Sequence, residues 1–530
     1  MSWMKKLIIA LTFIGLLPAT NSFGRDGHND VIPVMTRYFE LVVSGNFDIA
    51  GDMWSPEALE RSQRFGINYN DIRLKTDCNS PVIRHWDKIT SKVIAPIRKY
   101  EVLEEGLWYK LEYADVYGSS LLKHNYYAER RGDWFWFSYP QDFYAADWPV
   151  VESRYFRVRV DPEVQKYVND VALAEADKFV DMVAERLGMA SERLDLIAKT
   201  KIEYFYCSSD SVVEQITGFL VKGTLDLASN DVISADFPHF HEISHLLVNI
   251  HFQDLPLYTL PVVREGLAVY FGGRWGKHPA VLMDLATALY DQQLLTFDSV
   301  LTMRGFDSES GADIVYPVSG IFCGYLIDRL GMPEFLELYL KLSGKFSYLN
   351  GLSTEDIQKI ITDATGHADW VTLTTDFETY LKSYVESKLS ARPGIGNGGD
   401  ELVSQDQYVV RETDDWISFE FHGDRSGAPL QGNLVFAPQE DLKGQVSSLF
   451  EAHYGESRTY EGYRFGVRFD RNEIGLYDYG SNLLVAKYIW GITPSDDYYD
   501  ADRNMITARF DKSLFQSFLP HEGQCQLLPL

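Results

Sequence analysis

The chain is poor in cysteine, with only four in 530 residues, and this excludes a disulfide-rich scaffold. Cys207 and Cys323 fall in apolar stretches, where we expect free thiols inside a core. A bridge between Cys78 and Cys525 is compatible with the sequence, but spacing alone does not determine a pairing.

Basic residues are also scarce, since 49 lysines and arginines stand against 76 aspartates and glutamates. The formal charge is −27, and loss of Lys5 and Lys6 with a leader segment makes it −29 (−27 − 2). Such an acidic chain is not expected to bind nucleic acid, because phosphates need lysine and arginine partners. The acidic surface favours solubility and also attracts divalent cations.

Long apolar runs are absent, and no segment reaches the roughly 20 residues that a membrane span needs. The apolar residues 7–17 follow two lysines and precede small and polar residues, an order typical of a secretory signal peptide. Cleavage is expected near Ser22 or Gly24. We therefore expect residues 1–24 to be a signal peptide and the mature protein to be exported, either periplasmic or secreted.

What the sequence does contain is His-Glu-Ile-Ser-His at residues 241–245, inside an apolar helical run. Two histidines four residues apart lie on one face of a helix, with Cβ atoms about 5–6 Å apart. His241 and His245 can therefore share one ion at Zn–N distances of about 2.0–2.1 Å. Glu242 is placed to take a proton from a zinc-bound water, whose pKa falls to about 7. The alternative is a helix whose histidines only pack or face solvent, but chance gives this motif roughly 0.02 times in such a chain.

Two downstream residues are candidates for a third ligand. His251 has the offset of the metzincin pattern, but Val248 stands where that pattern needs a glycine. Glu265 follows Pro261 on a short, mostly apolar helix, where an unpaired carboxylate would be costly. We predict Glu265 as the ligand and His251 as a histidine at the helix end or beside the ligands. The alternative for Glu265 is a surface glutamate that favours the helix dipole.

H-E-x-x-H, followed after 19 intervening residues by E-G-x-A-x-Y, resembles the gluzincins, the zinc metallopeptidases of the thermolysin and aminopeptidase N superfamily. The resemblance covers residues 150–392. It implies one zinc ion per chain, held by His241, His245 and Glu265, with Glu242 as general base. It also implies a peptide or protein as the substrate.

A further element, at residues 316–331, is similar to the tyrosine-led helix of the aminopeptidase N branch. In that branch the tyrosine hydroxyl hydrogen-bonds the oxyanion, so the resemblance implies this role for Tyr316. The alternative is a packing tyrosine, in a chain with 32 tyrosines. The aminopeptidases also carry a G-x-M-E-N strand whose glutamate grips the substrate amino group. Residues 223–231 have no such glutamate, so aminopeptidase specificity is not implied.

The length and the local patterns predict three domains after the signal peptide. Residues 25–149 combine a helix at 34–43 with aromatic-rich strands at 102–117 and 126–139. This pattern resembles the cystatin-like cone of the nuclear transport factor family, which we expect to bind or brace rather than to catalyse. Residues 150–392 form the metallopeptidase-like domain.

The C-terminal part changes to period-two alternation. Residues 393–406 are rich in glycine and are predicted to be a linker. Residues 407–530 show alternating strands, which predict a β-sandwich or a partial barrel. The overall prediction is an α+β multidomain fold, in which a helix-rich gluzincin zinc-peptidase domain lies between an N-terminal α+β cone-like domain and a C-terminal all-β domain.

These features predict an exported zinc-dependent metallohydrolase, most simply a peptidase with Glu242 as general base. An alternative from another class is a catalytically silent zinc-containing protein whose accessory domains capture a partner. The intact Glu242 counts against it, because a structural site needs no base. Hydrolysis of a non-peptide amide or ester would use the same residues. The sequence sets neither the cleavage specificity nor the oligomeric state.

Overall fold

The computed structural model describes most of the N-terminal and central parts of the chain, and a set of strands in the C-terminal part. The described residues are 31–84, 99–104, 107–117, 120–165, 168, 170–274, 279, 282–283, 286–287, 312–343, 352–391, 400–405, 408–412, 416–422, 433–436, 463–468, 473–478, 483–489, 498–500, 505–511 and 525–528. They form a mixture of helices and sheets, as the sequence predicts. The predicted signal peptide, residues 1–24, lies outside them.

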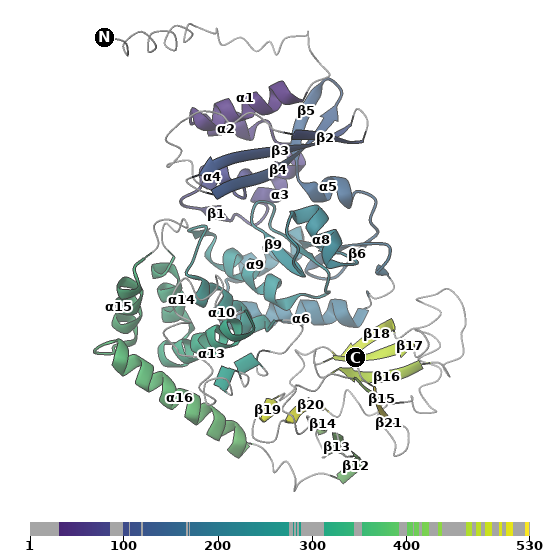
Figure 1. The fold of residues 1–530 in the computed structure, drawn as a ribbon, viewed down its shortest axis with the longest axis vertical. Coiled ribbons are helices and arrows are strands. Elements are labelled where there is room, and N and C mark those ends of the chain that lie inside the picture. Colours follow the sequence, from purple (N-terminus) through teal and green to yellow (C-terminus); the bar gives the residue numbers. More distant parts are fainter. Residues whose placement is uncertain are drawn as a thin grey trace.

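The N-terminal unit places helices on a four-stranded antiparallel sheet in the order β2-β3-β4-β5 (Figure 1). Its main elements are α1 (Ile32–Val43), α2 (Phe47–Gly51), α3 (Pro56–Gln63), β2 (Lys99–Glu104), β3 (Trp108–Tyr117), β4 (Ser120–Arg131), β5 (Trp134–Ser138) and α5 (Pro140–Tyr144). The segments predicted as strands at residues 102–117 and 126–139 each cover parts of two paired strands, β2 with β3 and β4 with β5. The sheet therefore has four strands rather than two.

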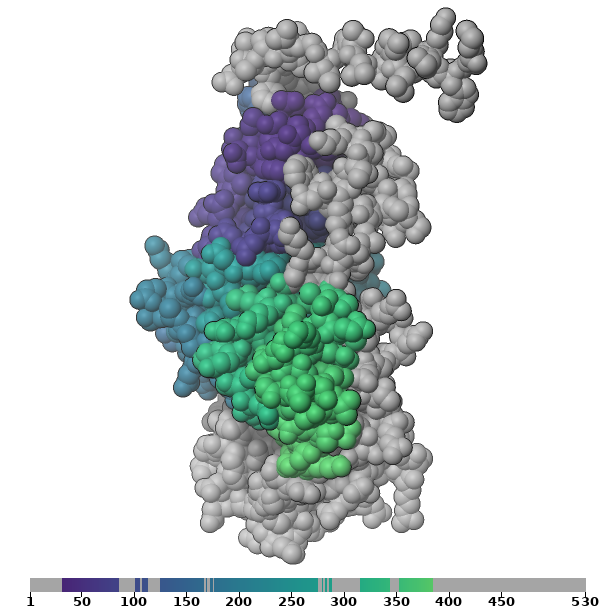
Figure 2. Space-filling view, turned by 90° about the vertical axis from the view of Figure 1, so that its left-hand side faces the viewer, coloured from purple at the N-terminus to yellow at the C-terminus, as the bar shows by residue number. Residues whose placement is uncertain are grey.

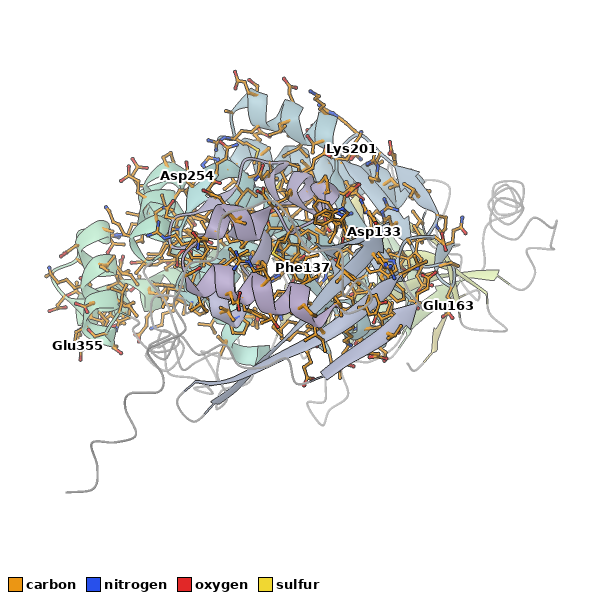
Figure 3. All side chains as sticks on the ribbon, turned by 90° about the horizontal axis from the view of Figure 1, so that it is seen from above. Asp133, Phe137, Glu163, Lys201, Asp254 and Glu355 are labelled. Atoms are coloured by element: carbon orange, nitrogen blue, oxygen red, sulfur yellow. The ribbon has the colours of Figure 1, made fainter. Side chains whose placement is uncertain are left out.

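Aromatic side chains form the core of this unit. The rings of Tyr38 on α1 and Phe137 on β5 have centroids 4.9 Å apart, and Tyr126 on β4 lies 5.5 Å from Phe39. Figure 3, which looks down on the unit, places Phe137 in its interior beneath the helices. All four of these residues are at most 2 % exposed, so the alternating aromatic pattern of the sequence corresponds to burial.

The central unit begins with a five-stranded sheet in the order β6-β7-β8-β10-β9. Its strands are β6 (Val150–Glu152), β7 (Phe156–Val160), β8 (Ile202–Tyr206), β9 (Gly223–Asp226) and β10 (Asp231–Ser234). The pairs β7–β8 and β8–β10 are parallel, whereas β9 pairs antiparallel with β10 and stands at the end of the order. One edge of β9 is therefore left without a neighbouring strand among the described residues.

Helices cover this sheet and extend away from it (Figure 1). They are α6 (Asp170–Leu187), α7 (Ser191–Thr200), α8 (Asp210–Thr217), α9 (Phe240–Phe252), α10 (Pro261–Gly272), α13 (Ala312–Leu330), α14 (Met332–Lys341), α15 (Thr354–Thr365) and α16 (Trp370–Ala391). The long helix α6 starts at Asp170. Residues 162–164 form a turn beside Asp161, whose carboxylate accepts hydrogen bonds from the Glu163 and Ser208 backbone N–H groups.

Two glycines let α10 approach its neighbours closely. A Cβ atom on Gly266 would lie 2.4 Å from the carbonyl oxygen of Ser319 on α13, and one on Gly272 would lie 2.5 Å from the backbone of Phe240 on α9. Any larger residue at either position would push the helices apart. The close packing fixes the position of α10 against the histidine helix α9.

The C-terminal part contains two five-stranded antiparallel sheets, in the orders β12-β13-β14-β20-β19 and β18-β17-β16-β15-β21. The strands are β12 (Asp400–Gln405), β13 (Tyr408–Glu412), β14 (Trp416–His422), β15 (Asn433–Phe436), β16 (Tyr463–Arg468), β17 (Glu473–Asp478), β18 (Leu483–Ile489), β19 (Tyr498–Asp500), β20 (Met505–Asp511) and β21 (Cys525–Leu528). β12 occupies the second half of the predicted linker, because its backbone pairs with β13.

The cysteines within the described core are reduced. Cys78, Cys207 and Cys323 are buried free thiols, so Cys78 is not bridged to Cys525. The helices described here include none with the combination of length and apolarity that crossing a membrane requires.

Candidate metal centre

Helix α9 and helix α10 bring three potential ligands to one point. His241 and His245 lie one turn apart on α9, and their Nε2 atoms are 3.1 Å and 3.3 Å from Oε2 of Glu265 on α10. The three donor atoms all lie within 4.8 Å of one another. This largely buried group could bind a metal ion, and the same three residues are those predicted from the sequence.

The orientation of His241 fits a metal ligand. Its Nδ1 lies 2.8 Å from the carbonyl oxygen of Gly273, to which it donates a hydrogen bond in the tautomer that leaves Nε2 as an acceptor. Histidine ligands commonly use their second ring nitrogen in this way. Burial lowers the pKa of His241, which keeps the ring neutral and its Nε2 lone pair available.

The two carboxylate oxygens of Glu265 have different partners. Arg264 donates to Oε1 from Nε at 3.0 Å and from Nη2 at 2.7 Å, while Oε2 faces the two histidines. Burial alone would raise the pKa of Glu265, but the charge of Arg264 and the histidines outweigh it and hold the pKa well below its usual range. Two imidazole nitrogens and one ionised carboxylate oxygen are a donor set that suits a divalent transition-metal ion.

Glu242 lies on α9 beside the ligand group and only 9 % of it is exposed. Its Oε2 accepts a hydrogen bond of 3.0 Å from the backbone N–H of Leu225, in strand β9. The predicted base therefore stands between the ligands and the edge of the sheet. Glu242 and Leu225 line the same cavity as Glu265.

Tyr316, in the first part of α13, also lines this cavity. Its ring centroid is 6.0 Å from that of His241. Burial, together with the negative charge of Glu265, raises the pKa of Tyr316 to about 12, so that the hydroxyl remains a donor at neutral pH. The structure thus brings Tyr316 next to the candidate ligands although 50 residues separate it from Glu265 in the sequence, and no local pattern could predict this placement.

His251, the alternative third ligand, is not part of the donor group. It lies in the last turn of α9 with its ring 5.3 Å from that of Phe252. Among the described residues, the group of potential ligands at this place consists of His241, His245 and Glu265 alone. The valine at position 248 keeps α9 helical through this turn, as the sequence argument expected.

Two arginines of the centre were not predicted. Arg264 holds Glu265, and Arg274 follows the end of α10 with its guanidinium stacked 3.5 Å over the ring of Tyr316. Arg274 Nη1 also lies 3.0 Å from His241 Nε2. An ion that uses this nitrogen would require the guanidinium to shift, because both would occupy the same lone pair. The position of Arg264 directly before the predicted ligand could have pointed to it, whereas Arg274 has no such signal in the sequence.

The cavity around the centre has a volume of about 870 Å³, within the range of ligand-binding clefts. Its central-unit lining includes Glu242, His245, Glu265, Arg274 and Tyr316. Its other wall comes from the N-terminal unit and includes Asp77, Arg84, His124, Tyr126 and Tyr139. The N-terminal unit therefore forms one wall of the cavity, and the expectation that it binds or braces stays a prediction.

Buried polar contacts attach this wall to the turn between β9 and β10. Asp231, whose side chain is fully buried, pairs with Arg64 at 2.7 Å and accepts a hydrogen bond from Gln141 at 2.6 Å. Lys75 reaches the same turn through Asn230, at 3.2 Å. Figure 2 shows the purple N-terminal unit seated directly on the teal central unit. Removing one partner of a buried ion pair commonly costs about 3–5 kcal/mol, because the other charge is left unpaired, so loss of Arg64 or Asp231 should loosen this wall.

No family model, curated protein or solved structure matches this chain. The chemistry of the centre therefore follows from its own residues.

Proposed function

We propose that the chain is a zinc-dependent hydrolase of gluzincin type that cleaves peptide bonds. The observation that carries this proposal is the meeting of two histidine nitrogens and one glutamate oxygen within 4.8 Å, beside the second carboxylate of Glu242. Three protein ligands with an adjacent general base are the composition of a catalytic zinc site rather than a structural one.

His241, His245 and Glu265 would hold the zinc ion, which when bound supplies a Lewis acid and an activated water. Glu242 would act as the general base: its carboxylate would accept a proton from the attacking water and pass it to the nitrogen of the leaving amine. Tyr316 donates a hydrogen bond to the carbonyl oxygen as negative charge develops there, which its high pKa permits. Arg264 keeps Glu265 turned so that Oε2 faces the histidines.

The edge of β9 supports a peptide as substrate. Thr224, Leu225 and Asp226 of this strand line the cavity, and β9 ends the strand order of its sheet. An extended peptide can add to such an edge through main-chain hydrogen bonds. The scissile bond of a peptide bound there would lie close to Glu242, because Leu225 already contacts that carboxylate.

The finer domain assignment belongs to the same proposal. Residues 150–392 would form the gluzincin-type domain, with the N-terminal α+β unit as a wall of its cleft and residues 407–530 as a β-rich accessory domain. Export through the segment at residues 1–24 stays a prediction from the sequence.

The test is cleavage of a diverse peptide library by the full-length mature protein, with mass-spectrometric mapping of the products. We expect cleavage that a zinc chelator abolishes and that added zinc restores. A protein that holds one zinc ion per chain and cleaves no member of the library would contradict the proposal and favour a zinc-containing binding protein.

A further inference from the structure

The connection between α8 and β9 exposes three consecutive apolar side chains. Phe219 is 68 % exposed, Leu220 is 66 % exposed and Val221 is 38 % exposed. The other large apolar residues exposed in the described part of the chain are isolated positions: Ile49, Val102, Leu107, Trp134, Val150 and Val371. Exposed apolar residues that adjoin one another mark interaction sites more often than isolated ones do. We refer to residues 219–221 as the apolar lip.

The backbone of the apolar lip is held in place by its own hydrogen bonds. Gly218 ends α8 with a φ of +82°, and its N–H donates to the Glu214 carbonyl oxygen at 2.7 Å. The N–H of Phe219 donates to the hydroxyl oxygen of Thr217 at 3.1 Å, and that of Val221 donates to the Phe219 carbonyl oxygen at 3.0 Å. The fold thus presents these side chains outward from a fixed turn.

The apolar lip adjoins the cavity of the metal centre. Phe219 lines that cavity together with Glu242 and Tyr316. The chain continues from the lip into β9, whose Leu225 N–H contacts the Glu242 carboxylate. Phe219 precedes Leu225 by six positions, and an extended chain advances about 3.3 Å per residue, so the backbones of these two residues lie at most about 20 Å apart. A peptide extended along β9 would reach it within about six residues of the scissile bond.

We propose that the apolar lip binds a bulky apolar side chain of the peptide substrate and makes the enzyme selective for such a residue near the cleaved bond. This inference rests on the proposed peptidase function. The continuity of Phe219 with the catalytic cavity identifies the substrate as the occupant, rather than a partner that docks elsewhere. Contact with an apolar side chain removes the exposed surface of Phe219 and Leu220 from water, which favours binding.

The test compares two peptides that differ at one position, which carries leucine in one and serine in the other. The position is the one at which library mapping finds the strongest side-chain preference. Hydrolysis of both peptides is measured for the wild-type protein, Phe219→Ser and Leu220→Ser. Val371→Ser is the matched control, because Val371 is 72 % exposed on α16 and does not line the cavity.

We expect wild type to prefer the leucine peptide by about tenfold or more in kcat/KM, the scale of apolar pocket discrimination. Phe219→Ser should lose most of this preference through a higher KM, with kcat, zinc content and Tm unchanged. Val371→Ser should behave as wild type. The proposal would be overturned if both lip variants kept the preference for the leucine peptide. It would also be overturned if the variants lost kcat/KM equally for the two peptides.

The outcomes separate this inference from the proposed function. Cleavage by wild type without apolar preference would overturn the role of the lip and leave the peptidase proposal intact. If wild type cleaves no member of the library, the peptidase proposal fails, and the role of the lip is then decided by binding of two labelled peptides, one with leucine and one with serine at the same positions, measured by fluorescence anisotropy. Selective binding of the leucine peptide that Phe219→Ser abolishes would support it, and equal binding of both peptides would overturn it.

Discussion

The guanidinium of Arg264 donates two hydrogen bonds to a single carboxylate oxygen of Glu265, Oε1, at 3.0 Å and 2.7 Å. The other oxygen, Oε2, lies 3.1 Å and 3.3 Å from the Nε2 atoms of His241 and His245. Arg264 thus holds one carboxylate oxygen of Glu265, its neighbour in the sequence, and leaves the other oxygen directed at the two histidines. This arrangement favours Glu265 as a ligand through one oxygen.

Removal of the two Arg264 nitrogens that donate hydrogen bonds to Glu265 should weaken metal binding. In Arg264→Met the length of the side chain is kept, but Glu265 loses its anchor. Because residues that orient a ligand commonly contribute about 10–100-fold to metal affinity, we expect a loss of that size in competition with a zinc-binding dye. Arg264→Lys, which keeps the charge but not the paired donors, should give an intermediate affinity. An unchanged affinity in Arg264→Met would show that Glu265 needs no anchor.

The choice between the two candidate third ligands can be tested by zinc content. Since Glu265 belongs to the donor group and His251 does not, Glu265→Ala should lose most of its bound zinc and His251→Ala should keep about one ion per chain. Elemental analysis after dialysis measures both variants. The reverse result would indicate a metzincin-type centre and contradict the geometry described here.

The hydroxyl of Tyr316 can be tested by its removal. If it stabilises only the transition state, Tyr316→Phe should lower kcat by roughly 10²–10³-fold with little change in KM. The phenylalanine ring still supports the Arg274 guanidinium, so we expect nearly the same Tm. A lowered Tm with nearly normal kcat would assign the hydroxyl a packing role instead.

The parts of the site predicted from the sequence are those encoded locally or by a specific motif. The helical period places His241 and His245 on one face, and an apolar helix that contains Glu265 indicates a carboxylate in need of a partner. The position of Tyr316 was predicted only through a family resemblance. The α+β composition and most of the strands follow from alternation and turn residues.

The parts of the site that were not predicted depend on contacts between distant segments, and a single sequence gives no signal for such contacts. Nothing local to Arg64 or Asp231 shows that they pair across 167 residues and fix the N-terminal unit at the cavity. Arg274 also has no local signal in the sequence, because its stacking on Tyr316 requires the packing of α10 against α13. The sequence likewise does not show that the apolar lip at Phe219 is exposed, because three consecutive apolar residues are compatible with a buried segment.

Asp77 should make the stability of the N-terminal unit depend on pH. Tyr38 and Tyr126 donate hydrogen bonds to its Oδ2, but burial outweighs them and raises the pKa of Asp77 from 3.8 to about 7. Because the pKa in the folded protein is the higher one, the contribution of this carboxyl to stability is fully present below about pH 4. It is lost progressively as the pH rises to about 7.

The matched variant is Asp77→Asn, which keeps an acceptor for both tyrosines and cannot ionise. Its stability relative to wild type should rise between about pH 4 and pH 7 and then level off. The difference between 3.8 and about 7 corresponds to an upper limit of roughly 4 kcal/mol. Urea unfolding across this pH range measures it, and a difference that does not change with pH would contradict the assignment.

The most direct test of the central claim is the zinc content and the peptide hydrolysis of Glu242→Gln, measured on one preparation. Glutamine keeps the shape of the side chain and an oxygen that accepts from Leu225, but it cannot take a proton. We predict that zinc stays at about one ion per chain while hydrolysis falls at least about 10²-fold, the lower end for loss of a general base. Unchanged hydrolysis by the zinc-loaded variant would contradict the account.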